Sequence, residues 1–281
     1  MAVTETKDYF VNLRLRPTKL GWMFFMPSDD IIGKSFDLFG EYSAMEEALI
    51  KKFFQPGWTV VDVGANIGGL TLPMANAVGP TGQVIAFEPQ LVVFNLLVAN
   101  VFVNGYFNVD CRRQALGREK STVQIPVFNY NHIQNYGAVG KDHWGKGVDT
   151  ELLALDMLNL RDLHFLKVDV EGMEQDVLIG AKETITRCRP LMFVEADREG
   201  VADETIRLIK SFNYTPYWYI NFVYNEQNYF KNSENPFGGM CSFNLFCLPN
   251  GGRWKVEGLA VAQEGDKVGE VSFDKVVQGI S

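Results

Sequence analysis

Short apolar runs alternate with segments of helical periodicity along most of the chain, which is the pattern of an α/β protein. Residues 59–63 and 83–87 are apolar and rich in β-branched side chains, as in strands that are buried on both faces of a parallel sheet. Residues 70–78 and 91–104 follow these runs and read as helices, the first ending at Gly79 and the second before a glycine. The repeated order of strand and helix predicts a doubly wound sheet.

The same pattern continues through the second half of the chain. We expect three more strands of the main sheet, at 108–112, 165–172 and 191–197. Helices are expected between and after them, at 154–163, 173–187 and 202–211. Two final strands, at about 214–220 and 242–249, would form an antiparallel pair. The sequence therefore predicts a Rossmann-like sheet of about seven strands, mostly parallel, with an antiparallel last hairpin.

Three regions are expected along the chain. Residues 1–55 would add N-terminal strands, which the weak alternation of the first 33 residues suggests, and a lead-in helix over 36–54 that caps the site. Residues 56–250 would form the main domain, and residues 251–281 are polar and interrupted by glycine, as in an accessory tail. Residues 118–150 hold one short alternating strand and then a long polar loop, and loops of this length in compact domains are often functional.

A glycine loop followed by an acidic residue is the clearest chemical signal. Gly64, Gly68 and Gly69 follow the first strand, and Glu88 ends the second strand about twenty residues later. An acid at this position is placed to accept hydrogen bonds from the ribose hydroxyls of a nucleoside. Asn66 occupies the position where dinucleotide-binding loops usually have their middle glycine, so S-adenosylmethionine, which has no phosphate, fits better than NAD. A nicotinamide-dependent dehydrogenase is therefore the less favoured enzyme class.

Carboxylates stand at the ends of three predicted strands. Glu88, Asp169 with Glu171, and Glu195 all follow apolar runs directly. Because the carboxyl ends of parallel strands meet at one edge of a sheet, we expect these side chains to converge on a site. Transfer of a methyl group to a hydroxyl needs a base that takes the hydroxyl proton. Our candidate for this base is Glu171, supported by Asp169, and His132 is another. Two alternatives remain open: Glu171 caps the following helix, or the carboxylates hold a divalent cation.

The motifs together resemble a known family, the FkbM-type S-adenosylmethionine-dependent methyltransferases. The resemblance lies in PGWTVVDVGANIGGLTL, GQVIAFEP, an asparagine series at Asn95, Asn100 and Asn104, QALG at 114–117, and FLKVDVEGMEQDVLIGA at 165–181. These pieces span about residues 37–197. The resemblance implies a class I methyltransferase fold, S-adenosylmethionine as the methyl donor, and O-methylation of a hydroxyl on a sugar or another small molecule.

Candidate site residues follow from the strand ends and from the resemblance. The residues that we expect to bind the cofactor are Asp62, Gly64, Ala65, Asn66, Gly68, Glu88, Pro89, Gln114, Ala115 and Asp169. In members of this family the lead-in helix lies over the cofactor, which makes Tyr42 and Glu46 further candidates, and an insertion lies near the acceptor. The candidate acceptor contacts are Asn135, Tyr136 and His143 from that insertion, together with Glu195, Trp218 and Tyr224.

The last two candidates lie in a segment with nine aromatic residues among positions 212–230. An excess of this kind indicates either a stacking wall for a sugar or a set of core residues of the final hairpin, and both interpretations stay open.

Composition narrows the choice of partners. The chain has 281 residues, 34 acidic against 26 basic side chains and a formal charge of −8, which argues against nucleic acid. A small neutral or cationic acceptor fits better. Four scattered cysteines and the absence of a long apolar segment favour a cytoplasmic protein that does not span a membrane and needs no bound metal. The alternatives are a non-catalytic module that binds S-adenosylmethionine or a glycan, and an N-methyltransferase.

Overall fold

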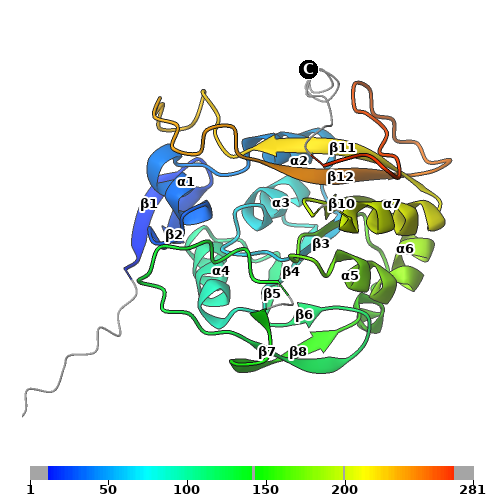
Figure 1. Ribbon diagram of the computed structural model, residues 1–281, viewed down its shortest axis with the longest axis horizontal. Coiled ribbons are helices and arrows are strands. Elements are labelled where there is room, and N and C mark those ends of the chain that lie inside the picture. The colour runs from blue at the N-terminus through cyan, green and yellow to red at the C-terminus, as the bar shows by residue number, and fades with distance from the viewer. Residues whose placement is uncertain (1–11, 141–142, 199, 269–281) are drawn as a thin grey trace, which may run out of the picture.

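A seven-stranded sheet runs through the centre of the computed structural model, which describes residues 12–140, 143–198 and 200–268 (Figure 1). Its strand order is β11-β12-β10-β9-β3-β4-β5. The neighbours from β10 to β5 are parallel, and β12 is antiparallel to both β10 and β11. The strands are β3 (Thr59–Val63), β4 (Gln83–Phe87), β5 (Val109–Arg112), β9 (Phe165–Val168), β10 (Leu191–Glu195), β11 (Tyr214–Phe222) and β12 (Cys241–Pro249).

Helices cover both faces of this sheet because alternate residues of each buried strand point to opposite sides. In β4, Val84 and Ala86 face one layer, while Ile85 and Phe87 face the other. The first layer holds α2 (Ala44–Phe53), α3 (Thr71–Val78) and α4 (Leu91–Val103), and the second holds α5 (Glu174–Gly180), α6 (Lys182–Cys188) and α7 (Val201–Ser211). The predicted fold class, a doubly wound, mostly parallel sheet of the class I methyltransferase type, is confirmed.

Two smaller sheets flank the main one (Figure 1). The N-terminal hairpin expected from the alternating sequence is present as β1 (Arg14–Thr18) and β2 (Gly21–Phe25), which pair antiparallel. A second small sheet consists of β6 (Ala115–Leu116), β7 (Ser121–Ile125) and β8 (Val148–Leu153), in the order β6-β8-β7. The sequence analysis missed β8 and assigned its residues to the end of a loop.

Asparagines of α4 attach the hairpin to the main domain. Asn100 is fully buried; its Oδ1 accepts the Phe24 N–H at 2.6 Å, and its Nδ2 donates to Ile67 O at 2.8 Å. Asn104 in turn accepts the Trp22 N–H at 2.9 Å and donates to Trp22 O at 2.7 Å. The asparagine series therefore holds β2 to α4, and Asn100 reaches the glycine loop as well.

Three predicted helices differ from the structure. The lead-in helix over 36–54 is two helices, α1 (Ile32–Phe39) and α2, because Gly40 ends the first with a φ of 66°. The helix predicted at 154–163 is wrong: β8 runs to Leu153, and only a 3₁₀ turn, Leu155–Leu158, follows before Asn159 adopts a φ of 48°. The helix expected at 173–187 is divided into α5 and α6 at Ala181.

Among the described residues, no helix is long and apolar enough to cross a bilayer.

Candidate active site

The glycine loop after β3 lies against the end of β9. Gly64 has a φ of 80°, and a Cβ atom on it would lie 1.8 Å from Asp169 O, so only glycine fits there. The N–H groups of Gly64 and Ala65 both donate to Phe87 O, at 3.0 and 2.9 Å. Asn66 then adopts a φ of 49°, a left-handed conformation that asparagine tolerates better than most residues. These contacts bring the ends of β3, β4 and β9 together.

Glu88 anchors the loop from the tip of β4. It is 4% exposed, and its two carboxylate oxygens accept the Asn66 N–H at 3.0 Å and the Gln90 N–H at 2.8 Å. Burial raises the pKa of Glu88 to about 7, although the two backbone hydrogen bonds oppose the shift. Each oxygen keeps a second lone pair, so the carboxylate can still accept the hydroxyls of a ribose.

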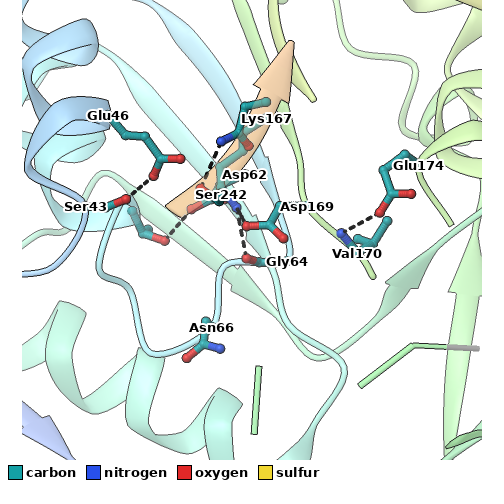
Figure 2. Close-up of polar contacts among 12 residues, drawn as sticks. Ser43, Glu46, Asp62, Gly64, Asn66, Lys167, Asp169, Val170, Glu174 and Ser242 are labelled. Carbon is teal, nitrogen blue, oxygen red and sulfur yellow. Dashed lines mark hydrogen bonds and ion pairs between the residues drawn. The ribbon is translucent and has the colours of Figure 1, made fainter. Parts of the chain in front are cut away.

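A buried lysine lies beneath the loop. Lys167 is on β9 directly opposite Asp62 of β3, and its ammonium group lies 3.4 Å from Asp62 Oδ1 and 3.1 Å from Asp169 Oδ2. It also donates to Gly64 O at 3.2 Å. Figure 2 shows this lysine between the two carboxylates and the loop. Carboxylates surround the ammonium group, and they raise the pKa of Lys167 in spite of burial, so it remains a cation.

The turn after β9 holds Glu171 in an unusual backbone conformation. Glu171 has a φ of 56°, which is uncommon for a residue with a side chain. Glu174 fixes this turn, because its Oε1 accepts the Gly172 N–H at 2.9 Å and the Val170 N–H at 3.3 Å (Figure 2). Arg198 Nη2 lies 3.2 Å from Glu171 Oε2. Glu174 thus bonds the turn before α5, no side chain caps the helix, and the carboxylate of Glu171 pairs with Arg198, so the helix-cap interpretation of Glu171 is wrong.

Two adjoining cavities open along this edge of the sheet. The first, which we call the carboxylate cavity, has a volume of about 120 Å³ and is lined largely by polar groups. The second, the apolar cavity, has a volume of about 60 Å³. Both include Gly64, Glu88, Gly137, Asp169 and Glu171 in their walls, so these residues form the boundary between them. Further walls of the carboxylate cavity are Tyr42, Glu46, Asn66, Asn135, Lys167, Glu195, Ser242 and Asn244.

The cavities match the two ends of an adenosyl sulfonium compound. The apolar cavity contains Pro89, Gln114 and Ala115, which are among the residues expected to bind the cofactor. It also contains Gln90, whose Oε1 is buried and has no hydrogen-bond donor among the described residues. An unpaired buried acceptor is costly, and a donor group of a bound ligand would satisfy it. The residues present therefore fit S-adenosylmethionine, with Glu88 at the ribose between the two cavities.

Most cofactor candidates meet at these cavities. Gly64, Ala65, Asn66, Glu88 and Asp169 line the carboxylate cavity. Asp62 and Gly68 line neither cavity. Asp62 is fully buried and accepts the Thr71 hydroxyl at 2.6 Å.

Several acceptor and base candidates do not reach the cavities. Trp218 is 1% exposed, lies in the core, and donates from Nε1 to Asp266 at 2.8 Å, so its assignment to a stacking wall is wrong. The Tyr136 ring is fully buried among other aromatic side chains, so it cannot contact an acceptor either. Tyr224 packs edge-on against Phe39 and lines neither cavity.

His132 and His143 are both exposed and line neither cavity, so the structure does not support His132 as the base. Asn135 and Glu195 do line the carboxylate cavity.

The sequence analysis overlooked four polar wall residues, Lys167, Gln90, Ser242 and Asn244. Lys167 interrupts an apolar strand, which was a usable signal, because a buried lysine requires partners. Gln90 follows Glu88-Pro89 directly. Ser242 and Asn244 alternate along β12 and gave no local signal.

Several other acids of the cavity walls also have raised pKa values, and a larger hollow lies elsewhere on the protein. Burial raises the pKa of Glu46 and of Glu171 to about 7. Burial, together with the neighbouring acids, raises the pKa of Glu195 well above its usual range. Among the described residues, no group of His, Cys, Asp and Glu could hold a metal ion. A larger hollow of about 710 Å³ lies at the opposite edge of the sheet, where its one carboxylate, Asp110, is paired with Arg112.

Comparison with known proteins gives the family. Residues 62–216, more than half of the chain, match the family model described as the methyltransferase FkbM domain. Methyltransferase 1 of Beauveria bassiana is 31% identical over 144 residues, which are 43% of this chain and 57% of that protein. The chain thus spans little more than half the length of this relative.

Two solved structures align with part of this chain. A methyltransferase FkbM from Methylobacillus flagellatus aligns with a TM-score of 0.46 and 16% identity, over 69% of this chain and 44% of the other. A SAM-dependent methyltransferase from Aquifex aeolicus aligns with a TM-score of 0.41 and 16% identity, over 80% and 98%. The assignment rests on the family model: the chain belongs to the FkbM family of methyltransferases, and its cofactor is S-adenosylmethionine.

Proposed function

We propose that the protein transfers a methyl group from S-adenosylmethionine to a hydroxyl group of a sugar or another small molecule. The observation that carries the proposal is the position of Glu171, a carboxylate in the walls of both cavities whose pKa is raised to about 7. A base with a pKa near neutrality suits the removal of a proton from a hydroxyl. It lies where the methionine end of the donor and an acceptor would meet.

The chain's own residues would hold the donor in three places. Glu88 would accept the ribose hydroxyls, and the apolar cavity, with Gln90 Oε1, would take the base. Glu46 and Asp169 line the carboxylate cavity beside the glycine loop and would face the ammonium group of the methionine end. Lys167 would keep Asp169 and the Gly64 carbonyl in position.

S-adenosylmethionine supplies a methyl group that is activated by its bond to a positively charged sulfur. The protein must hold the hydroxyl oxygen in line with that bond, because the reaction is one displacement at carbon. The bond from oxygen to carbon forms as the bond from sulfur to carbon breaks, and sulfur keeps the electron pair. Glu171 receives the hydroxyl proton, so no charged oxygen remains on the product.

The polar walls support a small hydroxylated acceptor. Asn135, Ser242 and Asn244 offer amide and hydroxyl groups to the carboxylate cavity. The formal charge of −8 opposes binding to nucleic acid, whose affinity depends on basic side chains. We also infer a cytoplasmic location, since all four cysteines are unpaired, as they would be in a reducing compartment.

Turnover with a library of hydroxylated and amino compounds tests the proposal. We expect S-adenosylhomocysteine to form with one or more sugars or small alcohols, and mass spectrometry should place the methyl group on oxygen. Glu171→Gln should abolish product formation while leaving the binding of S-adenosylhomocysteine intact. A methyl group on nitrogen would instead identify an N-methyltransferase, and cofactor binding without product from any compound would indicate a binding module.

A further inference from the structure

The carboxylate cavity is lined by more carboxyl groups than there are cations of the protein beside them. Five carboxylates line it, and Lys167 is its only lining cation among the described residues. The five acids are Glu46, Glu88, Asp169, Glu171 and Glu195. Burial of unpaired charge costs several kcal/mol per ion, so a buried acid such as Glu46 or Glu88 needs a partner or a proton.

Three of the five have partners within the protein. Asp169 pairs with Lys167 at 3.1 Å, and Glu171 with Arg198 at 3.2 Å. Glu88 accepts two backbone N–H groups and is the acid assigned to the ribose. These three carboxylates therefore need nothing further from an acceptor.

The other two have no cation within 4.0 Å among the described residues. Glu46 is 8% exposed, and its single hydrogen bond is from the hydroxyl of Ser43 (Figure 2). The half-buried side chain of Glu195 has no hydrogen bond or ion pair to any described residue, and Glu195 lines the cavity. A cationic ligand would supply the partner that these two acids lack.

The two acids belong to different parts of the cavity wall. Glu46 is on α2, which packs against α3 and the glycine loop, where the methionine end of the donor would bind. Glu195 ends β10, and its partner in the ladder is Asn244 of β12. The donor has one net positive charge, and its ammonium group belongs beside the glycine loop, so Glu195 remains for the acceptor.

Asn244 offers a second acceptor atom beside Glu195. It is 3% exposed and lines the cavity, and its Nδ2 donates to Ser242 Oγ at 3.1 Å. Its Oδ1 accepts no hydrogen bond from the described residues, so it is free for a ligand donor. A carboxylate and an amide oxygen side by side suit an ammonium group, which has three donors and no acceptor.

We propose, on the basis of the proposed function, that the acceptor carries an ammonium group close to the hydroxyl that is methylated, as an amino sugar or an amino alcohol does. Glu195 and Asn244 Oδ1 bind this ammonium group, and Glu171 receives the proton of the hydroxyl. Glu195 is thus a specificity residue that selects a cationic acceptor.

Paired probes that differ only at nitrogen test this inference. Methyl glucosaminide is compared with its N-acetyl derivative, and ethanolamine with N-acetylethanolamine. Binding is measured by calorimetry on protein saturated with S-adenosylhomocysteine, so the result does not depend on turnover. We expect the ammonium member of each pair to bind at least tenfold more tightly, and Glu195→Gln to remove the difference.

Two controls separate the possible results. Glu257→Gln, at an exposed glutamate that lines neither cavity, should keep the preference of the native protein. Thermal unfolding should show that Glu195→Gln is folded. If it is not, Asn244→Asp is used instead, and this variant should strengthen the preference for ammonium. Equal binding of both members of every pair would overturn the proposal, and this is the result expected if Glu195 is simply protonated. A preference that survives Glu195→Gln would overturn it as well.

Turnover distinguishes this inference from the proposed function. Methylation of neutral hydroxyl compounds without any preference for ammonium would leave the proposed function standing and refute the cationic acceptor. If the ammonium probes bind and the methyl group is found on nitrogen, the binding of a cationic acceptor would stand and transfer to a hydroxyl would be refuted.

Discussion

Lys167 and Asp62 lie directly opposite each other on β9 and β3, with the lysine Nζ 3.4 Å from the Asp62 Oδ1. Both side chains are almost completely buried, at 4% and 1% exposed. The lysine also reaches Asp169 and the Gly64 carbonyl, so one cation connects two strands and the glycine loop. This contact explains how an acidic site can be held rigid before any ligand binds.

Removal of this cation should therefore destabilise the fold. Lys167→Met leaves the buried carboxylate of Asp62 without its cation and removes the partner of Asp169, whose side chain is 41% exposed, and we expect a loss of about 3–5 kcal/mol in the free energy of unfolding. Urea denaturation measures the change. Adding Asp62→Asn to the same protein should recover part of the loss, since one unpaired charge is then gone. A double variant less stable than Lys167→Met would contradict the pairing.

Glu88→Gln should weaken cofactor binding without unfolding the protein. A hydrogen bond to a charged group contributes about 1.5–3 kcal/mol, so the dissociation constant of S-adenosylhomocysteine should rise roughly tenfold to hundredfold. Calorimetry gives the constant, and Glu119→Gln, at an exposed glutamate, is the matched control. Unchanged affinity in the Glu88 variant would remove the ribose assignment.

The rate of methyl transfer should depend on pH through Glu171. The base acts as a carboxylate, and its pKa is raised to about 7, so the protonated and inactive form predominates below that value. We expect kcat to fall about tenfold per pH unit below pH 7 and to level off above it. The rate is followed at saturating substrates between pH 5 and 9. Glu171→Gln should lower kcat by a factor of roughly 10² to 10⁴, and a variant with the native pH profile would exclude this base.

Asn66 should tolerate glycine and reject valine. Its φ of 49° is in the left-handed region, where a β-branched side chain is strained by about 1–2 kcal/mol. We expect Asn66→Val to lower the free energy of unfolding by that amount and Asn66→Gly to change it by less. Both keep the N–H that donates to Glu88, so a comparison of the two isolates the backbone effect. Equal losses in the two variants would show that the side-chain amide matters instead.

The cofactor half of the site could be predicted from the sequence because its signals are local. The strand, glycine loop, helix and second strand lie within residues 59–88, and their spacing alone placed Glu88 beside the loop. The five central strands and the antiparallel last hairpin were predicted for the same reason, since each apolar run defines its own strand. The strand β8 was missed, and the lead-in helix was predicted as one helix although Gly40 ends α1 with a left-handed backbone conformation.

Which polar side chains share one cavity was decided only by the tertiary structure. Lys167 meets Asp62 across 105 positions of sequence, and Glu195 meets Asn244 across 49, so no local pattern relates them. The aromatic segment shows the same limit: an excess of rings indicated either core or binding wall, and only packing placed Trp218 in the core. The sequence by itself predicted the strands of the main sheet, in their succession along the chain, and the residues expected at the nucleoside end of the site. The balance of charge that selects a ligand depends on contacts between distant residues, which exist only in the folded chain.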